Sequence, residues 1–344
     1  MKVVVDINHP AHVHLFKNFI SIMEKKGHEV LITASEKDIT FRLLNVLNLN
    51  YINLGTYGKS IFKKLINIPV LDLKMYLSVT KFNPDVFVSV GSVRAAHVAY
   101  IMRKTSIAFE DTEHCKEQHL LYVPFTNKIL TPSCFKKRLG RKQVQYNGYH
   151  ELAYLHPNYF TPNPAVLHEL GLSEGDLFII LRFVSWDASH DIGEHGLKNK
   201  AKFVKGLEGY GRVLITSEDK LDPFLSKYEI KISPEKLHDL LYYATLYVGE
   251  GSTTASECAV LGTHAIFVNT LNLGCIEDQE NYGLLYNTSN LDSMEDEAFN
   301  KARELLKNPD LWQEGKKKRE CLLKDKIDVT AFMVKFIEDT VDKM

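Results

Sequence analysis

The chain has 344 residues, a length that favours two domains over a single core. Its five cysteines are scattered without a CxxC pair, which argues against a disulfide framework or a zinc site and favours a reducing cytoplasm. The net charge of −1 hides an asymmetry: residues 1–160 carry 21 Lys and Arg against 12 Asp and Glu (+9), and the remainder carries 21 against 31 (−10). We therefore expect different partners for the two halves, and we expect no nucleic acid among them.

The first residues predict a strand, a helix and a second strand. Residues 2–6 and 28–33 are apolar, and 13–26 show helical periodicity. The turn lacks the GxGxxG fingerprint, so NAD binding is disfavoured. Because ligands in open α/β sheets bind at the carboxyl ends of strands, His9, His12 and His14 fall at a ligand-binding edge. A functional role and a plain surface role both remain open for these histidines.

Residues 59–69 form a basic amphipathic segment, with a helix expected after it to about Lys81. Apolar residues alternate with lysines there: Lys59, Ile61, Phe62, Lys63, Lys64, Leu65 and Ile66. Such a pattern suits contact with an anionic membrane, and the more common alternative is a core-facing helix with solvated lysines. No apolar run approaches the roughly 20 residues of a spanning helix, and no signal peptide is recognised.

A buried-type strand at 106–109 runs into Glu110-Asp111-Thr112-Glu113-His114. Acids and a histidine at a strand's carboxyl end indicate a catalytic base or a binding site for an acceptor hydroxyl, and a solvated capping loop is the alternative. Residues 127–131 are expected to close the first sheet. Prolines then mark a linker, which predicts domains at 1–160 and 161–325, with a C-terminal helix, 326–344, that crosses back to the first domain.

The most informative stretch runs from Val248 to Gly262 and predicts strand, tight turn and helix. Glycines let backbone approach a ligand, hydroxyl side chains suit N-caps, and a helix N-terminus attracts phosphate. Glu257, one turn further, is placed to accept hydrogen bonds from a ribose diol. Arg182 and His190, near the end of an earlier strand, are candidates for extra phosphate contacts. An ordinary capped βαβ turn is the alternative. The candidate ligand-binding residues of the turn and helix are Gly251, Ser252, Thr253, Thr254 and Glu257.

These motifs resemble those of the GT-B superfamily, in particular the lipid-linked GlcNAc transferase of peptidoglycan synthesis and the non-hydrolysing UDP-GlcNAc 2-epimerases. The segments 6–14, 148–155 and 181–190 identify the chain as a member of the domain-of-unknown-function 354 family. The resemblance implies an α/β fold of two doubly wound Rossmann-like domains facing a central cleft, and it implies no particular reaction.

Departures from the epimerase pattern favour a transferase. Ser92 stands where epimerases carry an acid after glycine, although Glu110 matches their next glutamate. We therefore predict a metal-independent glycosyltransferase, without a cofactor, that moves a sugar from a UDP-linked donor to an envelope or capsular glycan, lipid-linked or free. The candidate bases are His12, His14, Glu110 and Asp111. A cytoplasmic enzyme, peripheral at the inner face of the plasma membrane through 59–69, would fit. A nucleotide-sugar epimerase or hydrolase and a non-catalytic nucleotide-sugar binder remain alternatives.

Overall fold

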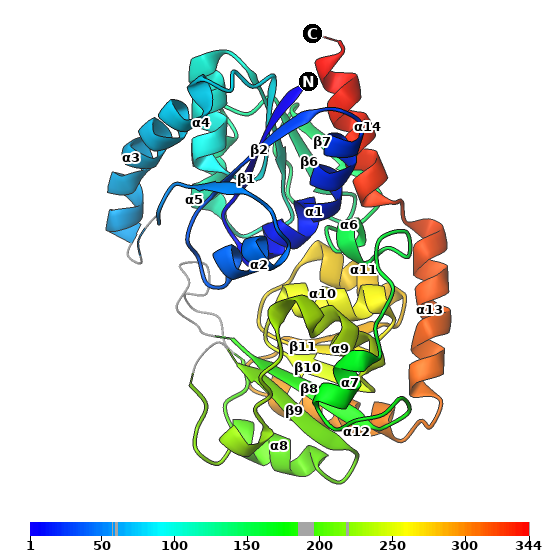
Figure 1. Ribbon diagram of the computed structural model, residues 1–344. Helices are drawn as coiled ribbons and strands as arrows, with labels where there is room; N and C mark the ends of the chain where they lie inside the picture. Colours follow the sequence, from blue (N-terminus) through cyan, green and yellow to red (C-terminus); the bar gives the residue numbers. More distant parts are fainter. Residues whose placement is uncertain (57, 59–60, 185–195, 218–219, 344) are drawn as a thin grey trace. The chain divides into compact units, whose positions relative to one another are not determined.

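The computed structural model describes residues 1–56, 58, 61–184, 196–217 and 220–343 (Figure 1). The chain divides into two compact units. Unit 1 comprises Met1–Tyr154 and Ile327–Met344, and unit 2 comprises Leu155–Lys326. Within the described ranges, no helix is both long and apolar enough to cross a membrane.

Unit 1 is built on a seven-stranded parallel sheet in the order β3-β2-β1-β4-β5-β6-β7. Its central strands are short apolar runs that are buried on both faces, as parallel strands covered by helices require. The strand order reverses between β1 and β4, and ligands of open parallel sheets bind at the carboxyl ends of the strands at such a point. The strands are β1 (Lys2–Ile7), β2 (Glu29–Ala34), β3 (Tyr51–Asn53), β4 (Val86–Val90), β5 (Thr105–Phe109), β6 (Lys128–Pro132) and β7 (Gln143–Tyr146).

Helices cover both faces of this sheet (Figure 1). On one face lie α1 (Pro10–Lys25), α2 (Thr40–Val46) and α14 (Val329–Val341). On the other lie α3 (Ile61–Thr80), α4 (Val93–Met102) and α5 (Lys116–Tyr122), where α3 and α4 share a core with Val4 and Phe87. The short α6 (Leu152–Leu155) ends at the unit boundary. Because α14 packs on α1, the last residues of the described chain belong to unit 1.

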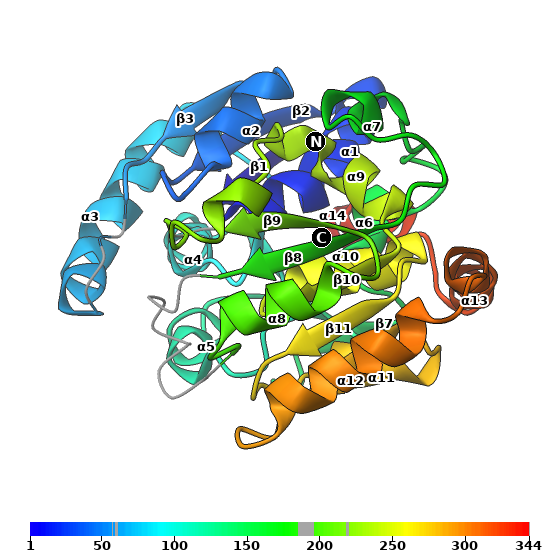
Figure 2. The ribbon, with the colours of Figure 1, turned by 90° about the horizontal axis from the view of Figure 1, so that it is seen from below.

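Unit 2 has a five-stranded parallel sheet in the order β12-β11-β10-β8-β9 (Figure 2). Its apolar core fills the space between this sheet and the helices α8 and α12. The opposite face is covered by α10, which packs against α9 and α13. The order reverses between β8 and β10. The elements are α7 (Ala165–Glu169), β8 (Phe178–Phe183), α8 (Lys200–Leu207), β9 (Arg212–Ser217), η1 (Ser226–Tyr228), η2 (Pro234–Lys236), α9 (Leu237–Tyr243), β10 (Leu246–Gly249), α10 (Ser252–Leu261), β11 (Ala265–Val268), α11 (Gly274–Asn281), β12 (Leu285–Thr288), α12 (Met294–Leu306) and α13 (Leu311–Asp325).

Two local predictions differ from the structure. The first sheet does not close at 127–131, because β7 adds an edge strand whose sequence, Gln-Val-Gln-Tyr, lacks an apolar run. The segment 59–69 is not separate from the following helix, because α3 runs continuously from Ile61 to Thr80 through Pro69. Lys59 and Ser60 lie outside the described residues.

Candidate functional site

A buried ion pair lies at the carboxyl edge of the unit 1 sheet, where the strand order reverses. Asp6, at the end of β1, and Arg94, in α4, are both fully buried, and Arg94 Nη2 lies 2.7 Å from Asp6 Oδ1. Ser92 Oγ donates to the same carboxylate at 2.6 Å, and Thr33 Oγ1 donates at 2.7 Å. Burial alone would raise the pKa of Asp6, but Arg94 and the hydroxyl donors lower it below its ordinary value. Because its oxygens are occupied, Asp6 acts as a structural anchor.

Beside this ion pair, Asp111 and His150 form a dyad. Asp111 follows β5, His150 lies between β7 and α6, and His150 Nδ1 is 2.9 Å from Asp111 Oδ2. Burial would raise the pKa of Asp111, but the His150 ring holds it at about 2, so the carboxylate is ionised and Nδ1–H donates to it. Burial opposes the charged form of His150, yet Asp111 raises its pKa. His150 Nε2 is buried and has no hydrogen-bond partner among the residues that the structure describes. In the neutral ring, Nε2 is therefore the basic nitrogen.

His12 belongs to the same neighbourhood. It lies in the first turn of α1, and its Nδ1 accepts the Asn8 N–H at 3.3 Å, which places the proton of the neutral ring on Nε2. Burial lowers the pKa of His12 to about 3, although the nearby Asp111 carboxylate opposes that shift, and His150 lowers it further. A neutral His12 thus offers a hydrogen-bond donor next to the dyad.

The other two predicted bases make different contacts. Glu110 is 2% exposed and accepts the Tyr122 hydroxyl at 2.8 Å and the Thr112 N–H at 2.8 Å. His119 Nε2 lies 3.3 Å from the same carboxylate. His14 is buried in α1, with its ring centroid 5.4 Å from that of Tyr154. The structure therefore brings together His12 and Asp111, adds His150, engages the Glu110 carboxylate with Tyr122 and Thr112, and packs His14 near Tyr154.

Sequence reasoning missed His150 as a site residue. It recognised the motif at 148–155 only as a mark of family resemblance and treated the residues around it as the lead into a linker. Asp111 and His150 are far apart in the chain and come together only because β5, β6 and β7 are neighbours in the sheet. The sequence signal for His150 is a histidine shortly after the carboxyl end of a strand. That signal is hidden because the strand, β7, has no apolar run and is not predicted from the sequence.

In unit 2 the glycine turn lies where the strand order reverses. Gly249 ends β10 and pairs in register with Arg182 of β8. Gly251 is the N-cap of α10, and no side chain in the described structure caps that helix. The expected hydroxyl caps from Ser252, Thr253 and Thr254 are therefore not formed, because these residues already lie inside the first helical turn. The first-turn N–H groups of α10 are left for another acceptor.

Glu250 fixes the shape of this turn. Its side chain is fully buried and accepts the Val184 N–H at 3.0 Å and the Leu197 N–H at 2.9 Å. Its carbonyl accepts the Asn269 side-chain amide at 2.9 Å. Burial raises the pKa of Glu250, and Lys200, 3.7 Å away, lowers it in part. The turn is thus attached to the chain on both sides of residues 185–195. His190, a predicted phosphate contact, lies outside the described residues.

Glu257 points toward α9. Its side chain is almost completely buried, and Oε1 lies 2.9 Å from His238 Nε2. Ser256 Oγ, the next residue back, accepts from Gln279 of α11 at 2.6 Å. The carboxylate predicted for a ribose is therefore held by a buried histidine that sequence reasoning did not identify.

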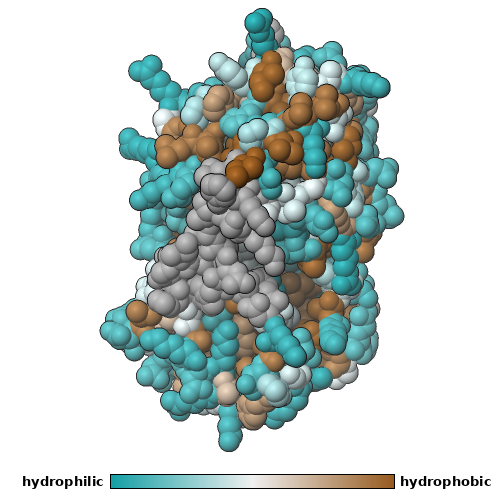
Figure 3. Space-filling view, turned by 90° about the vertical axis from the view of Figure 1, so that its left-hand side faces the viewer, coloured by the Kyte–Doolittle hydropathy of each residue, from teal (hydrophilic) through white to brown (hydrophobic). Residues whose placement is uncertain are grey.

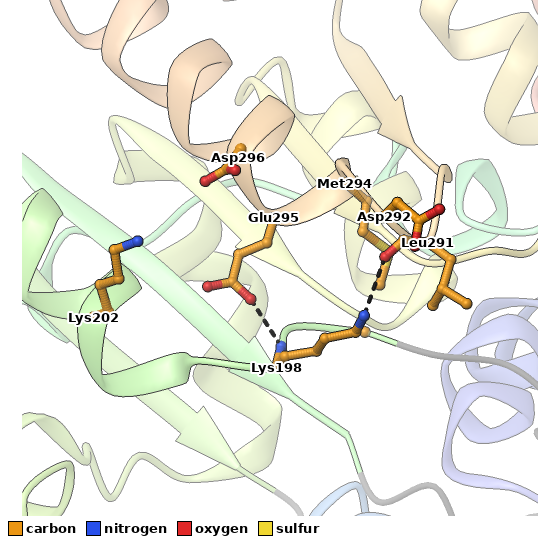
Figure 4. Close-up of a pocket in the computed structure, with 8 residues that line it drawn as sticks. Lys198, Lys202, Leu291, Asp292, Met294, Glu295 and Asp296 are labelled. Atoms are coloured by element: carbon orange, nitrogen blue, oxygen red, sulfur yellow. Dashed lines mark hydrogen bonds between the residues drawn. The ribbon is translucent and has the colours of Figure 1, made fainter.

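Two of the cavities in the described part of unit 2 are lined by charged side chains. One, of about 290 Å³, is lined by Val184, which follows β8, by Ser217, which ends β9, and by Lys198, Lys200 and Lys220. It therefore lies on the same sheet edge as the glycine turn, and its lining includes one acid, Asp222, beside the three lysines. The other, of about 220 Å³, is lined by two lysines, three acids and apolar groups (Figure 4). There Glu295 accepts the Lys198 N–H at 3.0 Å, and Lys198 Nζ donates to the Leu291 carbonyl at 3.3 Å, so its charged groups are partly engaged.

Two Rossmann-like units with parallel sheets, each with its candidate site at the carboxyl ends of the strands, define a protein of the GT-B fold. The chain belongs to the family described as "Protein of unknown function (DUF354)", whose sequence profile matches residues 1–339. The uncharacterized protein MJ0665 of Methanocaldococcus jannaschii is 24% identical over 275 residues, which are 76% of this chain and 80% of that protein.

Solved structures share the fold at low identity. The UDP-GlcNAc 2-epimerase from Neisseria meningitidis, bound to UDP-GlcNAc, has a TM-score of 0.66 at 11% identity, with 100% of both chains covered. The spinosyn rhamnosyltransferase SpnG also has a TM-score of 0.66, at 14% identity and 100% coverage of both chains. The structural neighbours thus include both nucleotide-sugar epimerases and glycosyltransferases.

Proposed function

We propose that this protein is a glycosyltransferase that moves a sugar from a UDP-linked donor to a hydroxyl of an envelope or capsular glycan. The observation that carries the proposal is the Asp111–His150 dyad, which holds one imidazole nitrogen buried and basic at the ligand-binding edge of unit 1. Such a nitrogen is suited to remove a proton from an acceptor hydroxyl.

The donor would bind in unit 2. The first-turn N–H groups of α10 would meet the diphosphate, with Arg182 nearby, and Glu257, held by His238, would accept a ribose hydroxyl. The choice of a uridine nucleotide is supported by the epimerase of this fold that is bound to UDP-GlcNAc. The positive end of the helix dipole would stabilise the departing diphosphate, so that the chain's own groups act on the leaving group.

The acceptor would bind in unit 1. Its hydroxyl oxygen forms a bond to the anomeric carbon of the sugar while the bond from that carbon to the diphosphate breaks. The hydroxyl proton passes to His150 Nε2, and Asp111 orients the ring and stabilises the imidazolium. The neutral His12 would donate a hydrogen bond from Nε2 to the acceptor.

The contacts of two residues favour a transferase over a 2-epimerase. Epimerisation by elimination and re-addition needs acids and bases acting on the sugar itself. Ser92, at the position of an epimerase acid, donates to Asp6 instead. Glu110, which matches the second epimerase acid, is held by Tyr122 and Thr112.

A lipid-linked acceptor would also bring the protein to the cytoplasmic face of the membrane, as a peripheral protein.

Donor binding is tested first, by thermal stabilisation with UDP, GDP, CMP, ADP, dTDP and their common sugar conjugates. A ligand at about 100 times its Kd adds ~2.7 kcal/mol of stability. Glu257→Ala should weaken binding of the best nucleotide by roughly tenfold or more, the effect of losing a charge-assisted hydrogen bond. Glu320→Ala, at an exposed glutamate of α13, is the matched control. Unchanged binding in Glu257→Ala would remove the proposed donor site.

The reaction is tested by release of free nucleotide from the selected donor in the presence of extracted membrane glycolipids and glycans. His150→Asn should lose activity by roughly a hundredfold or more while it keeps donor binding, and the exposed His168→Asn should not. Entry of solvent deuterium at C2 of the sugar without acceptor would establish the epimerase instead. A donor that stays chemically intact under all conditions would indicate a binding protein.

A further inference from the structure

Helix α3 is apolar on two opposite faces. One face is buried in unit 1: Leu71, Met75 and Val79 are at most 2% exposed. The opposite face carries four large apolar side chains, which we name the α3 stripe. Its spacings of four, three and four residues place all members on one line along the helix. The α3 stripe consists of Ile66 (56% exposed), Val70 (49%), Leu73 (58%) and Leu77 (65%).

This arrangement is unusual for a helix that faces water. A surface helix normally turns charged and polar residues outward, and contiguous apolar patches on soluble proteins mark interaction sites. Figure 3 faces the side of unit 1 where α3 lies and shows apolar residues gathered there. Tyr100 and Ile101, in the last turn of the neighbouring α4, are also more than 60% exposed, at 64% and 61%. The apolar surface therefore extends beyond α3.

The charges around the α3 stripe are basic. Lys74 lies beside Leu73 and Leu77 on the helix and is exposed, with its Nζ 3.5 Å from the Leu54 carbonyl, and the exposed Lys81 follows the helix end. Because α3 and α4 both run antiparallel to the strands, Arg103 and Lys104 after α4 lie at the same sheet edge as Lys81.

The acids of this region are already engaged. Between residues 59 and 104 the only acidic residues are Asp72 and Asp85. Asp72 Oδ2 lies 2.8 Å from His97 Nδ1, and Asp85 accepts the Lys2 N–H at 2.7 Å. A second copy docked through this face would bring lysines together without carboxylates to pair with them. An anionic surface would instead satisfy the lysines and cover the apolar side chains.

We propose that the α3 stripe and its lysines form a docking surface for a membrane that contains anionic phospholipids. The apolar side chains enter the boundary between headgroups and acyl chains, and Lys74 and Lys81 meet the phosphates. The surface lies on 66–81, further along the chain than the 59–69 segment that the sequence suggested. The inference goes beyond the proposed reaction and holds whether or not the protein is a transferase.

Vesicle flotation tests this surface with the full chain and without donor or acceptor. The protein should float with vesicles of phosphatidylcholine mixed with phosphatidylglycerol and should not float with phosphatidylcholine alone. Leu73→Gln/Leu77→Gln should weaken binding by roughly tenfold or more. Lys74→Gln/Lys81→Gln should weaken it by about fivefold per lysine, and high salt should weaken the binding of the wild type. Leu177→Gln, at an equally exposed leucine (59%) of unit 2, is the matched control.

Three results would overturn the proposal. The first is an absence of binding to the anionic vesicles, and the second is binding that survives Leu73→Gln/Leu77→Gln. The third is a dimer in sedimentation equilibrium that this double variant dissociates, which would assign the α3 stripe to a second copy. Because these leucines are exposed, the variants should keep the thermal stability of the wild type, which confirms that they fold. Nucleotide-induced stabilisation is measured separately, so failure of docking and failure of the proposed reaction are distinguishable.

Discussion

The dyad of unit 1 predicts a pH-dependent loss of stability in Asp111→Asn. This substitution keeps the size of the side chain and removes its charge. The pKa of Asp111 falls from 3.8 to about 2, and at 1.36 kcal/mol per pKa unit this corresponds to ~2.5 kcal/mol. The Asp111 side chain is 35% exposed, so solvent screens part of that interaction. We expect the free energy of unfolding to fall by ~1 kcal/mol.

The sign of the pH dependence follows from both partners. Asp111 has a lowered pKa, so its contribution is present above its ordinary value of 3.8 and is lost as pH falls through about 2. His150 has a raised pKa, so its contribution is present below 6.5 and is lost as pH rises through its folded-state value. The cost of Asp111→Asn should therefore be greatest between about pH 4 and pH 6.5 and should shrink on either side.

Urea unfolding across this pH range measures the stability difference, and NMR titration of the histidine ring protons measures the pKa of His150. In Asp111→Asn that pKa should fall, because the carboxylate that favours the imidazolium is gone. Asp339→Asn, at an exposed aspartate of α14, is the control. An unchanged His150 pKa, or a stability loss that is the same at every pH, would refute the dyad as the source of both shifts.

Three further predictions concern other parts of the chain. Gly91→Ala should lower the free energy of unfolding by ~2 kcal/mol or more in urea titrations, because φ is +47° and a Cβ would meet a carboxylate oxygen at 2.8 Å. Gly140→Ala, with φ at +87° and open space around it, should lower the free energy of unfolding by only ~1 kcal/mol. Equal losses in the two variants would show that crowding at Gly91 does not contribute. Burial lowers the pKa of Lys316 from 10.5 to about 6, so the free energy of unfolding of the wild type should increase as pH rises between these values. Lys316→Met should lose this increase, which unfolding measured near pH 7 and pH 9 would detect. Glu250→Gln should lower the melting temperature through a loss of ~1–3 kcal/mol, because one of two N–H groups loses its acceptor, whereas Glu320→Gln should not; equal melting temperatures would contradict this.

Sequence periodicity predicted most of the fold for a simple reason. Short apolar runs that alternate with helical patterns have few arrangements other than parallel sheets covered by helices. The pattern failed at β7, because an edge strand such as Gln143–Tyr146 does not need to be apolar. It also failed to place the exposed face of α3. A helix that is apolar on both sides gives no sign of which side is buried until its neighbours are known.

The sequence predicts a candidate site only where single residues or a short motif indicate a chemical role by themselves. The turn at Gly249–Gly251 stands out in the sequence, but the attachment of Glu250 to Val184 and Leu197 does not, because main-chain donors leave no pattern. The Asp111–His150 pair likewise depends on strand order rather than spacing. The predicted role of Ser252 as a cap failed because a cap must precede the helix, and Gly251 holds that position.

The return of the chain to unit 1 has a consequence for how the protein is made. Val329, Met333 and Ile337 of α14 are fully buried, and Glu338 binds Lys26 and His28 at 2.6 Å and 3.0 Å. The ribosome therefore completes all of unit 2 before it supplies the helix that finishes unit 1. During synthesis, unit 2 is able to fold while the side of α1 that packs on α14 is still uncovered. The first half of the nascent chain therefore emerges first but completes its core last.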